Sequence, residues 1–331
     1  MKNPPSPSRP LSLWARIRTF AIFLLLAALL YFALRNAPLM GIWTTLKNLQ
    51  PWQMLALLGI NAVIYLLVTL RWWLIVRAEK KSISFFPLLA IRVSVFGISY
   101  FTLGPQVGGE PLQVLYLERK YGMTYTRATS TVVMDKLLEF LANFVLLSVG
   151  LTAILQAGIL SASGNKSLLG LSGLVILLIW PPIHIMFIYR GKYPISAILR
   201  KFSNNKTVRF IAASERMAGT FCRRHLSSLV SAILVSILAA LGMVSEFFLI
   251  TSFLGIHLSF WQTIAAWTAG WLAFLVPLPG GLGALEASQV FALGAFGISA
   301  ASAIGVTLLI RARDILIGGL GLLLAGHGFK K

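Results

Sequence analysis

The sequence predicts an all-α polytopic integral membrane protein with about six full spans and two re-entrant helical hairpins of opposite orientation, arranged as an inverted-topology repeat. Two features of its composition indicate a membrane location: hydrophobic residues make up 57% of the 331 residues, and charged residues make up only 11%. Several apolar segments approach the ~20 residues that a membrane-spanning helix needs. We therefore expect a single membrane domain with short loops.

The apolar segments define the order of the expected membrane helices. They lie at residues 19–34, 52–76, 85–103, 128–157, 168–189, 228–253, 260–276, 285–297 and 300–325. Residues 1–18 form a basic tail, and the apolar segment after this tail has no convincing small-residue cleavage site. We expect that segment to be a retained anchor.

The orientation follows from the loop at residues 190–226, which is rich in lysine and arginine and holds a single acid, Glu215. The positive-inside rule makes this loop cytoplasmic, and we expect both termini to share that side. If residues 85–103 crossed the membrane fully, the basic loop would lie outside. The conflict disappears if residues 85–118 form a re-entrant hairpin that enters from the cytoplasm and returns to it.

A second re-entrant hairpin is needed at residues 260–297 for the same reason, and it enters from the outside. An odd number of full crossings separates the two hairpins, which is the arithmetic of an inverted-topology repeat. Its two cores are residues 85–157 and 260–325. Broken segments at corresponding places in two inverted halves are the best sequence indication of a transport site near the middle of the membrane.

Each hairpin contains a glycine-rich break that is accompanied by an acid. The breaks are "GPQVGGEP" and "PLPGGLG", and their candidate site residues are Gly108, Gly109, Glu110, Pro279, Gly280, Gly281 and Glu286. Unwound backbone at membrane depth is tolerated only inside protein or beside water, so we expect a polar binding surface there. The amino termini of the half-helices after the breaks favour a phosphate-like headgroup. Alternatively, the glycines form surface turns and the two acids only cap helices.

Charged residues inside or beside apolar segments are the other candidate site residues. They are Arg92, Asp135, Lys136, Glu139, Glu246, Arg311, Arg313 and Asp314. Because an ionisable group at the centre of a span costs about 2.5–3.5 kcal/mol, we expect these groups to be paired, hydrated or near the interface. A polar cavity between helices would meet that requirement.

The spacing of these charges predicts specific partners. Asp135 and Glu139 share a helical face, and Arg311 and Asp314 are spaced to interact along their helix. Lys136 is expected to neutralise an acid on a neighbouring helix. Glu246 is the most isolated, either as a protonatable coupling group or as a neutral, hydrogen-bonded acid. The alternative for the whole set is static ion pairs that hold helices together.

Other features narrow the function. Arg71, Trp72 and Trp73 have the composition of an interfacial anchor. Residues 190–226 are either an amphipathic stretch on the inner surface or a solvated loop. The formal charge of +20 resides mainly in loops that meet anionic lipid, so a nucleic-acid partner is not expected. The single cysteine, Cys222, allows no disulfide within the chain, and no metalloprotease or nucleophile motif is present, so we expect no enzyme activity, metal or cofactor.

Four stretches carry a resemblance to a known family. They are "GPQVGGEPLQVLYLERKYG" at 104–122, "TSTVVMDKLLEFLANF" at 129–144, "PLPGGLGALEASQVFALGAFG" at 277–297 and "TLLIRARDILIGGLG" at 307–321. With them, the chain resembles the flippase-like membrane family that is also described as the lysylphosphatidylglycerol synthase transmembrane region. The resemblance implies movement of phospholipids or lipid-linked species between leaflets. We expect no soluble aminoacyl-transferase domain, because the chain ends at Lys331.

The leading hypothesis is a lipid flippase in a bacterial or archaeal plasma membrane. Arg92, Arg311 and Arg313 would contact an anionic headgroup, while the acids would pair with them or bind a cationic portion. The alternative is a non-transporting accessory subunit that recruits a lipid-modifying enzyme through its basic cytoplasmic surface. A third hypothesis, an intramembrane transferase, is disfavoured because no acceptor-activating motif is evident.

Overall fold

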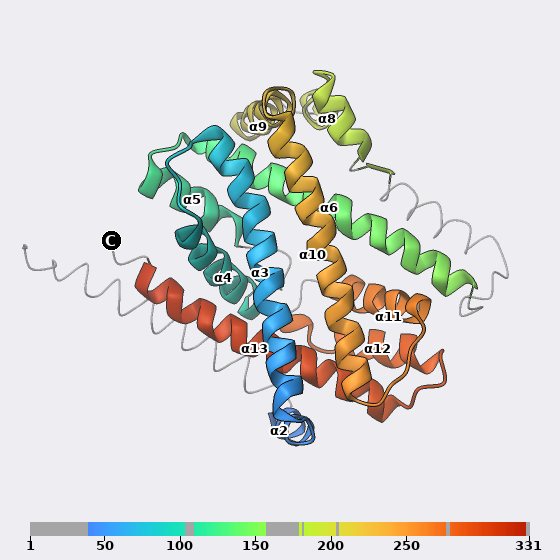
Figure 1. Ribbon diagram of the computed structural model, residues 1–331. Coiled ribbons are helices and arrows are strands. Elements are labelled where there is room, and N and C mark those ends of the chain that lie inside the picture. Colours follow the sequence, from blue (N-terminus) through green and yellow to red (C-terminus); the bar gives the residue numbers. More distant parts are fainter. Residues whose placement is uncertain are drawn as a thin grey trace, which may run out of the picture.

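The computed structural model describes residues 39–102, 109–156, 179–180, 182–202, 205–275 and 279–328. Every regular element in these ranges is a helix (Figure 1). The helices are α2 (Leu39–Lys47), α3 (Pro51–Glu79), α4 (Phe85–Phe101), α5 (Glu110–Tyr121), α6 (Tyr125–Gln156), α8 (Pro194–Phe202), α9 (Lys206–Arg224), α10 (Leu226–Phe253), α11 (Phe260–Ala273), the 3-10 turn η1 (Pro279–Gly281), α12 (Ala284–Gly294) and α13 (Ala300–Gly328). Residues 182–189 are also helical.

The helix boundaries agree with the predicted apolar segments to within a few residues. The segment at 19–34 and most of the segment at 168–189 lie outside the described residues, so those two predictions stay open. Local signals explain several boundaries. Pro51 is the first residue of α3, where a proline costs no helical hydrogen bond. Gly122 follows the last residue of α5 and ends the helix with a left-handed φ of 61°. Ser259 caps α11 by accepting a hydrogen bond from the amide of Gln262.

Two of the described helices, α3 and α10, are long and apolar enough to cross a membrane. They lie side by side through the middle of the molecule (Figure 1). Their outer faces expose large apolar side chains, including Leu58, Val63, Leu234 and Leu238. An exposed apolar face of this extent fits lipid better than water. The helices α6 and α13 are equally long, with 32 and 29 residues, but carry charges near their middle.

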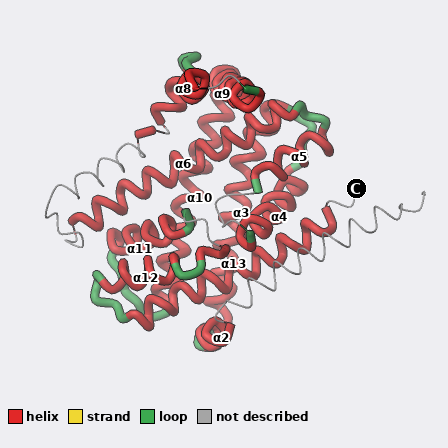
Figure 2. Tube along the Cα trace, turned by 180° about the vertical axis from the view of Figure 1, so that it is seen from behind, coloured by secondary structure: helices red, strands yellow, loops and turns green. Residues whose placement is uncertain are grey.

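The helices fall into two sets with matching contacts, α3 to α6 and α10 to α13. Within the sets, α5 packs on α6 as α12 packs on α13, and α4 contacts α5 as α11 contacts α12. Between the sets, α4 packs on α13 as α11 packs on α6, and α3 packs on α10. Figure 2 shows α11 and α12 lying between α6 and α13. These contacts correspond between the two sets, whereas the contact of α10 with α6 has no counterpart of similar extent between α3 and α13.

Glycines allow the closest approaches between the two sets. A Cβ at Gly321 of α13 would lie 2.2 Å from the carbonyl oxygen of Val93 in α4. A Cβ at Gly150 of α6 would lie 2.1 Å from Oγ1 of Thr268 in α11. These distances leave no room for a side chain at either glycine. The lack of a side chain lets α13 approach α4 closely, and it lets α6 approach α11 closely.

The basic segment at 190–226 is largely helical, so the prediction of a simple loop is wrong and the helical part of the amphipathic prediction is confirmed, while its place on the inner surface stays a prediction. Asn205 caps α9 by accepting a hydrogen bond from the Val208 amide at 2.9 Å. The buried face of α9 includes Val208 and Phe221. Glu215, the one acid of the segment, accepts hydrogen bonds from the amides of Ile195 and Ser196 and so caps the amino-terminal end of α8. Both helices lie at one end of α10 (Figure 1).

Candidate functional site

A cavity of about 240 Å³ lies between the two sets of helices. Residues of α3, α4, α5, α6, α10, α11, α12 and α13 line it. Seven predicted site residues are among them: Arg92, Glu110, Lys136, Glu139, Glu246, Arg313 and Asp314. The other described candidates lie behind this lining or at the breaks. The prediction that these charges gather around a cavity between the helices is thus consistent with the geometry of the described residues, although most of the lining surface is apolar.

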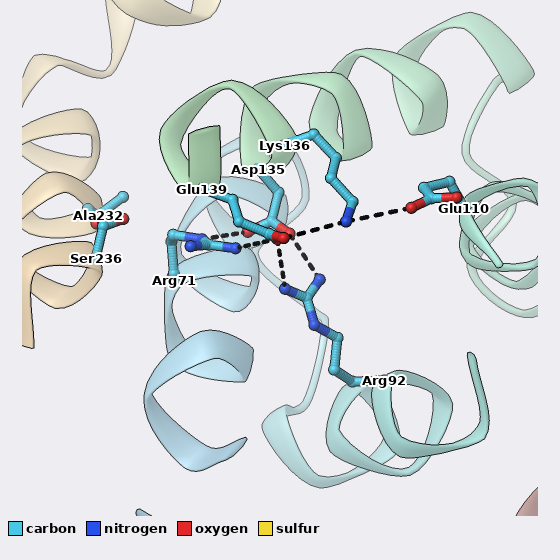
Figure 3. Close-up of polar contacts among 8 residues, drawn as sticks. All are labelled: Arg71, Arg92, Glu110, Asp135, Lys136, Glu139, Ala232 and Ser236. Carbon is cyan, nitrogen blue, oxygen red and sulfur yellow. Dashed lines mark hydrogen bonds and ion pairs between the residues drawn. The ribbon is translucent and has the colours of Figure 1, made fainter. Parts of the chain in front are cut away.

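The first group of charges is centred on Asp135, and we call it the α6 cluster (Figure 3). Asp135 is fully buried and accepts one bond from Arg71 Nε and one from Arg92 Nη1, both at 2.6 Å. Arg71 also reaches Glu139 Oε2 at 3.1 Å. One carboxylate thereby joins α3, α4 and α6, and the predicted common face of Asp135 and Glu139 is confirmed by their shared partner.

Lys136 extends the α6 cluster toward the first break (Figure 3). Its Nζ lies 3.3 Å from Glu139 Oε1 and 3.2 Å from Glu110 Oε1 at the start of α5. The prediction that Lys136 neutralises an acid from another helix is confirmed. Gly109 directly before α5 packs so close to α4 that a Cβ there would lie 2.3 Å from Val95 Cγ1. Gly108 lies outside the described residues.

The second group of charges, the α13 cluster, contains Arg313, Asp314 and Glu246. Arg313 lies 2.5 Å from Glu246 Oε1 through Nη1 and 2.8 Å from Asp314 Oδ1 through Nη2. Asn61 of α3 donates a further bond to Glu246 at 2.9 Å. The prediction that Glu246 is the most isolated acid is wrong. Arg313 of α13, 67 residues away in the chain, pairs with Glu246 of α10.

The predicted pair of Arg311 and Asp314 is also wrong. Arg311 instead holds Glu286 of α12, with Nε at 2.5 Å and Nη2 at 2.8 Å from its two carboxylate oxygens. Its Nη1 donates to the Gly280 carbonyl at 2.9 Å. Glu286 also accepts a bond from the Gly283 amide at 2.9 Å, so the acid caps α12 and pairs with Arg311 at once.

The second break is shaped around this arginine. Pro279, Gly280 and Gly281 form η1, and both glycines have left-handed φ values, 58° and 61°. That conformation favours glycine over residues with a Cβ. It turns the carbonyls of Gly280 and Gly281 toward Arg311. The break therefore has the polar, protein-lined backbone that the sequence predicted, with the Arg311 guanidinium as a partner.

Arg71 is the main residue that sequence reasoning missed. Its interpretation as an interfacial anchor is wrong, because Arg71 is 2% exposed and Trp72 is fully buried. Trp73, in contrast, stacks under Arg77 with 4.5 Å between the guanidinium carbon and the ring centre. The sequence did contain an indication of this role. Arg71 lies inside an apolar segment, and other apolar segments of the chain contain acids that need a basic partner.

The cavity lining repeats along the chain at a constant sequence interval. Each lining residue of α3 has a counterpart in α10, and each lining residue of α4 has one in α11 or directly after it, always the same number of residues later. The pairs are Asn61 and Ser236, Ile64 and Ala239, Tyr65 and Ala240, Val68 and Met243, Arg71 and Glu246, Arg92 and Trp267, Val95 and Gly270, Phe96 and Trp271, and Ser99 and Phe274. The two sets thus present corresponding positions to one cavity.

No group of three histidine, cysteine, aspartate or glutamate side chains among the described residues is placed to hold a metal ion. The acids of the cavity are held by arginine and lysine instead. These pairs connect the acids and cations of the cavity into ionic networks.

Long apolar helices around a buried charged cavity define an integral membrane protein. Residues 19–321 match the family model described as "Lysylphosphatidylglycerol synthase TM region". The chain therefore belongs to this family, as its motifs predicted. No curated protein and no solved structure matches the chain.

Proposed function

We propose that this protein is a lipid flippase that moves a charged headgroup between the leaflets of a plasma membrane through the cavity. The observation that carries the proposal is the cavity itself: two sets of helices line it at corresponding positions and surround it with ionisable residues. Ionisable residues in membrane helices commonly mark a substrate pathway. The family adds a relation to membrane lipids.

The matching helix contacts and the constant interval of the lining support an inverted repeat. Each break precedes a half-helix with an acid in its first turn, and each acid meets a cation on the next long helix: Glu110 with Lys136, and Glu286 with Arg311. We propose that α4–α5 and α11–α12 are re-entrant hairpins from opposite faces. Six full spans then remain, with both termini and the basic helices α8 and α9 in the cytoplasm.

Arg92, where the α6 cluster lines the cavity, could bind an anionic headgroup. Arg92 holds Asp135 at 2.6 Å but lies 3.7 Å from Glu139, so its second nitrogen is weakly engaged. A phosphate reaching this nitrogen would exchange one ionic partner for another without stripping the arginine of charge compensation. Acyl chains would remain in lipid. Transport of this kind forms no covalent bond, and we propose that the protein is not an enzyme.

Leaflet exchange of labelled phospholipids in liposomes tests the proposal. Arg92→Gln should slow exchange by at least about tenfold, because a charge-assisted bond is lost while Asp135 keeps Arg71. Arg127→Gln is the control, since Arg127 pairs with Glu79 outside the cavity. No exchange above empty liposomes would contradict the flippase. Partner binding that is lost on neutralising Arg209 and Arg224, with no exchange by the intact protein, would favour the accessory subunit.

Cysteine labelling tests the opposite hairpins. Lys120→Cys, at the end of α5, and Ala295→Cys, after α12, should react with an impermeant maleimide from opposite sides of the membrane. The native Cys222 should react little with the maleimide, because burial raises the pKa of its thiol to about 11 and keeps it protonated. Labelling of both new cysteines from one side would contradict the inverted repeat, and Cys222→Ser provides the blank.

A further inference from the structure

Three polar side-chain atoms in the lining of the cavity have no hydrogen-bond partner among the described residues: Gln113 Oε1, Gln289 Oε1 and Trp271 Nε1. The two glutamines are 2% and 0% exposed. Buried polar atoms in proteins are nearly always paired, so unpaired ones in a cavity wall indicate a group that binds there. None of the three belongs to the ionic network of the cavity.

The two glutamines occupy equivalent places in the two half-helices. Gln113 follows Glu110 by one helical turn in α5, and Gln289 follows Glu286 by one turn in α12. In each half-helix the acid is held by a cation of the next long helix, Lys136 or Arg311. This arrangement holds each half-helix in place, and its glutamine belongs to the cavity lining.

The amide of Gln289 has a defined orientation. Its Nε2 donates to the Ala266 carbonyl of α11 at 2.9 Å, which leaves Oε1 as the free acceptor. Gly270 makes this possible, because a Cβ at that position would lie 2.7 Å from Nε2. The neighbouring α11 therefore positions the amide, and the unpaired oxygen is a consequence of that positioning.

We propose that Gln113 and Gln289 bind the transported headgroup through their Oε1 atoms, accepting hydrogen bonds from its O–H or N–H groups. This inference rests on the proposed lipid transport and adds a requirement on the substrate: a headgroup with hydrogen-bond donors beside its phosphate. The cations of the cavity bind the phosphate and the glutamines select the donor. One glutamine from each hairpin gives the headgroup an equivalent contact on either side of its path.

Lipid-dependent thermal stabilisation of the purified full-length protein in detergent tests this directly. Phosphatidylglycerol offers hydroxyl donors, phosphatidylethanolamine offers ammonium donors, and phosphatidylcholine has the phosphate but no O–H or N–H donor. Either or both of the first two should stabilise the protein at concentrations about tenfold lower than phosphatidylcholine. Which of them does so identifies the donor. Equal stabilisation by all three lipids would overturn the inference.

Substitutions assign the preference to the glutamines. Gln113→Met should remove the advantage of the donor lipid and leave the response to phosphatidylcholine unchanged, whereas Gln113→Glu, which keeps acceptor oxygens, should retain it. Gln289→Met should act in the same way, although it also loses the bond to Ala266. Gln53→Met is the matched control, because Gln53 lies at the start of α3 outside the cavity lining. An unchanged preference in both methionine variants would overturn the inference.

Leaflet exchange measured on the same proteins separates this inference from the proposed function. Exchange without any preference for donor lipids would leave the flippase standing and refute the glutamine site. A glutamine-dependent preference in binding, with no exchange of any lipid, would refute the flippase and leave a lipid-binding site.

Discussion

The α6 cluster and the α13 cluster occupy equivalent places in the two helix sets but are built with opposite polarity. At corresponding positions of the central helices, α3 carries Arg71 and α10 carries Glu246. Arg71 binds acids on α6, whereas Glu246 binds Arg313 on α13. The contact between the central helix and the long helix is thus maintained while its charges are exchanged. What the fold requires at this place is a neutralised pair, and either order of charges supplies it.

The clusters also differ in the number of cations. Arg92 of α4 adds a second arginine to Asp135, but its counterpart in α11 is Trp267. The α6 cluster consequently has two arginines around two acids, whereas Arg313 alone serves both Glu246 and Asp314. The cavity lining therefore contains Arg92 on the α4 side, where the α11 side contributes Trp267 and Trp271. Removal of one acid should therefore have different consequences in the two clusters.

The largest effect is expected from Asp135→Asn. It leaves Arg71 and Arg92 buried beside a single remaining acid, and breaking a buried pair in this way costs about 3–5 kcal/mol. Glu246→Gln should cost less, because Arg313 keeps Asp314. Thermal unfolding in detergent with the two variants measured side by side gives the order. Equal losses would mean that the two clusters are energetically alike despite their different cation numbers.

A surface pair provides the baseline for this comparison. Glu79→Gln removes the partner of Arg127, whose side chain is 49% exposed. Exposed pairs contribute about 0–1 kcal/mol, so this variant should unfold close to the parent temperature. A loss as large as that of Asp135→Asn would indicate a general sensitivity to charge changes rather than an effect of burial.

Sequence reasoning predicted the helices well because long apolar segments and glycine-rich breaks are local signals. It also predicted that the charges must be neutralised, since that follows from the cost of burying them. It failed on the partners of Arg311 and Glu246. Local spacing favoured a pair of Arg311 with Asp314. In the folded structure, Glu286 instead accepts hydrogen bonds from Nε and Nη2 of Arg311. A bidentate partner on another helix prevails over a neighbour three residues away, and only the packing of α12 on α13 provides it.

Arg71 and the two cavity glutamines were missed for a different reason. Arg71 stands beside two tryptophans, a pattern that is common at membrane interfaces, and its burial comes from α4 and α6 closing over α3. Gln113 and Gln289 are uncharged, so the cost argument that singled out the acids does not apply to them. Their unpaired oxygens become visible only when every hydrogen bond around them is known.

An intermediate effect is expected at the glycines that join the two helix sets. Gly321→Ala would press a Cβ against the Val93 carbonyl, and backbone cannot move aside without separating α4 from α13. Gly150→Ala meets only side-chain atoms of Thr268, whose Oγ1 at 2.1 Å can turn away while its Cβ stays at 2.8 Å. We expect a loss of roughly 1–3 kcal/mol for the first and a smaller loss for the second, measured by thermal unfolding. The reverse order would show that α6 and α11 are the less adaptable pair.

The last comparison concerns the lysine and the arginine that play the same part in the two sets. Lys136 meets Glu110 with one nitrogen, whereas Arg311 grips Glu286 with two and also binds the Gly280 carbonyl. Arg311→Lys keeps the charge but loses the fork and leaves that carbonyl unpaired, at a cost of about 1–2 kcal/mol. Lys136→Arg should change stability by less than about 0.5 kcal/mol, because Lys136 is partly exposed and no carbonyl depends on it. Unfolding temperatures of the two variants, each read against the parent, test the difference. Equally small changes in unfolding temperature for both variants would contradict the prediction. The positive charge alone would then stabilise both hairpins, and the geometry of the guanidinium would not matter for the second break.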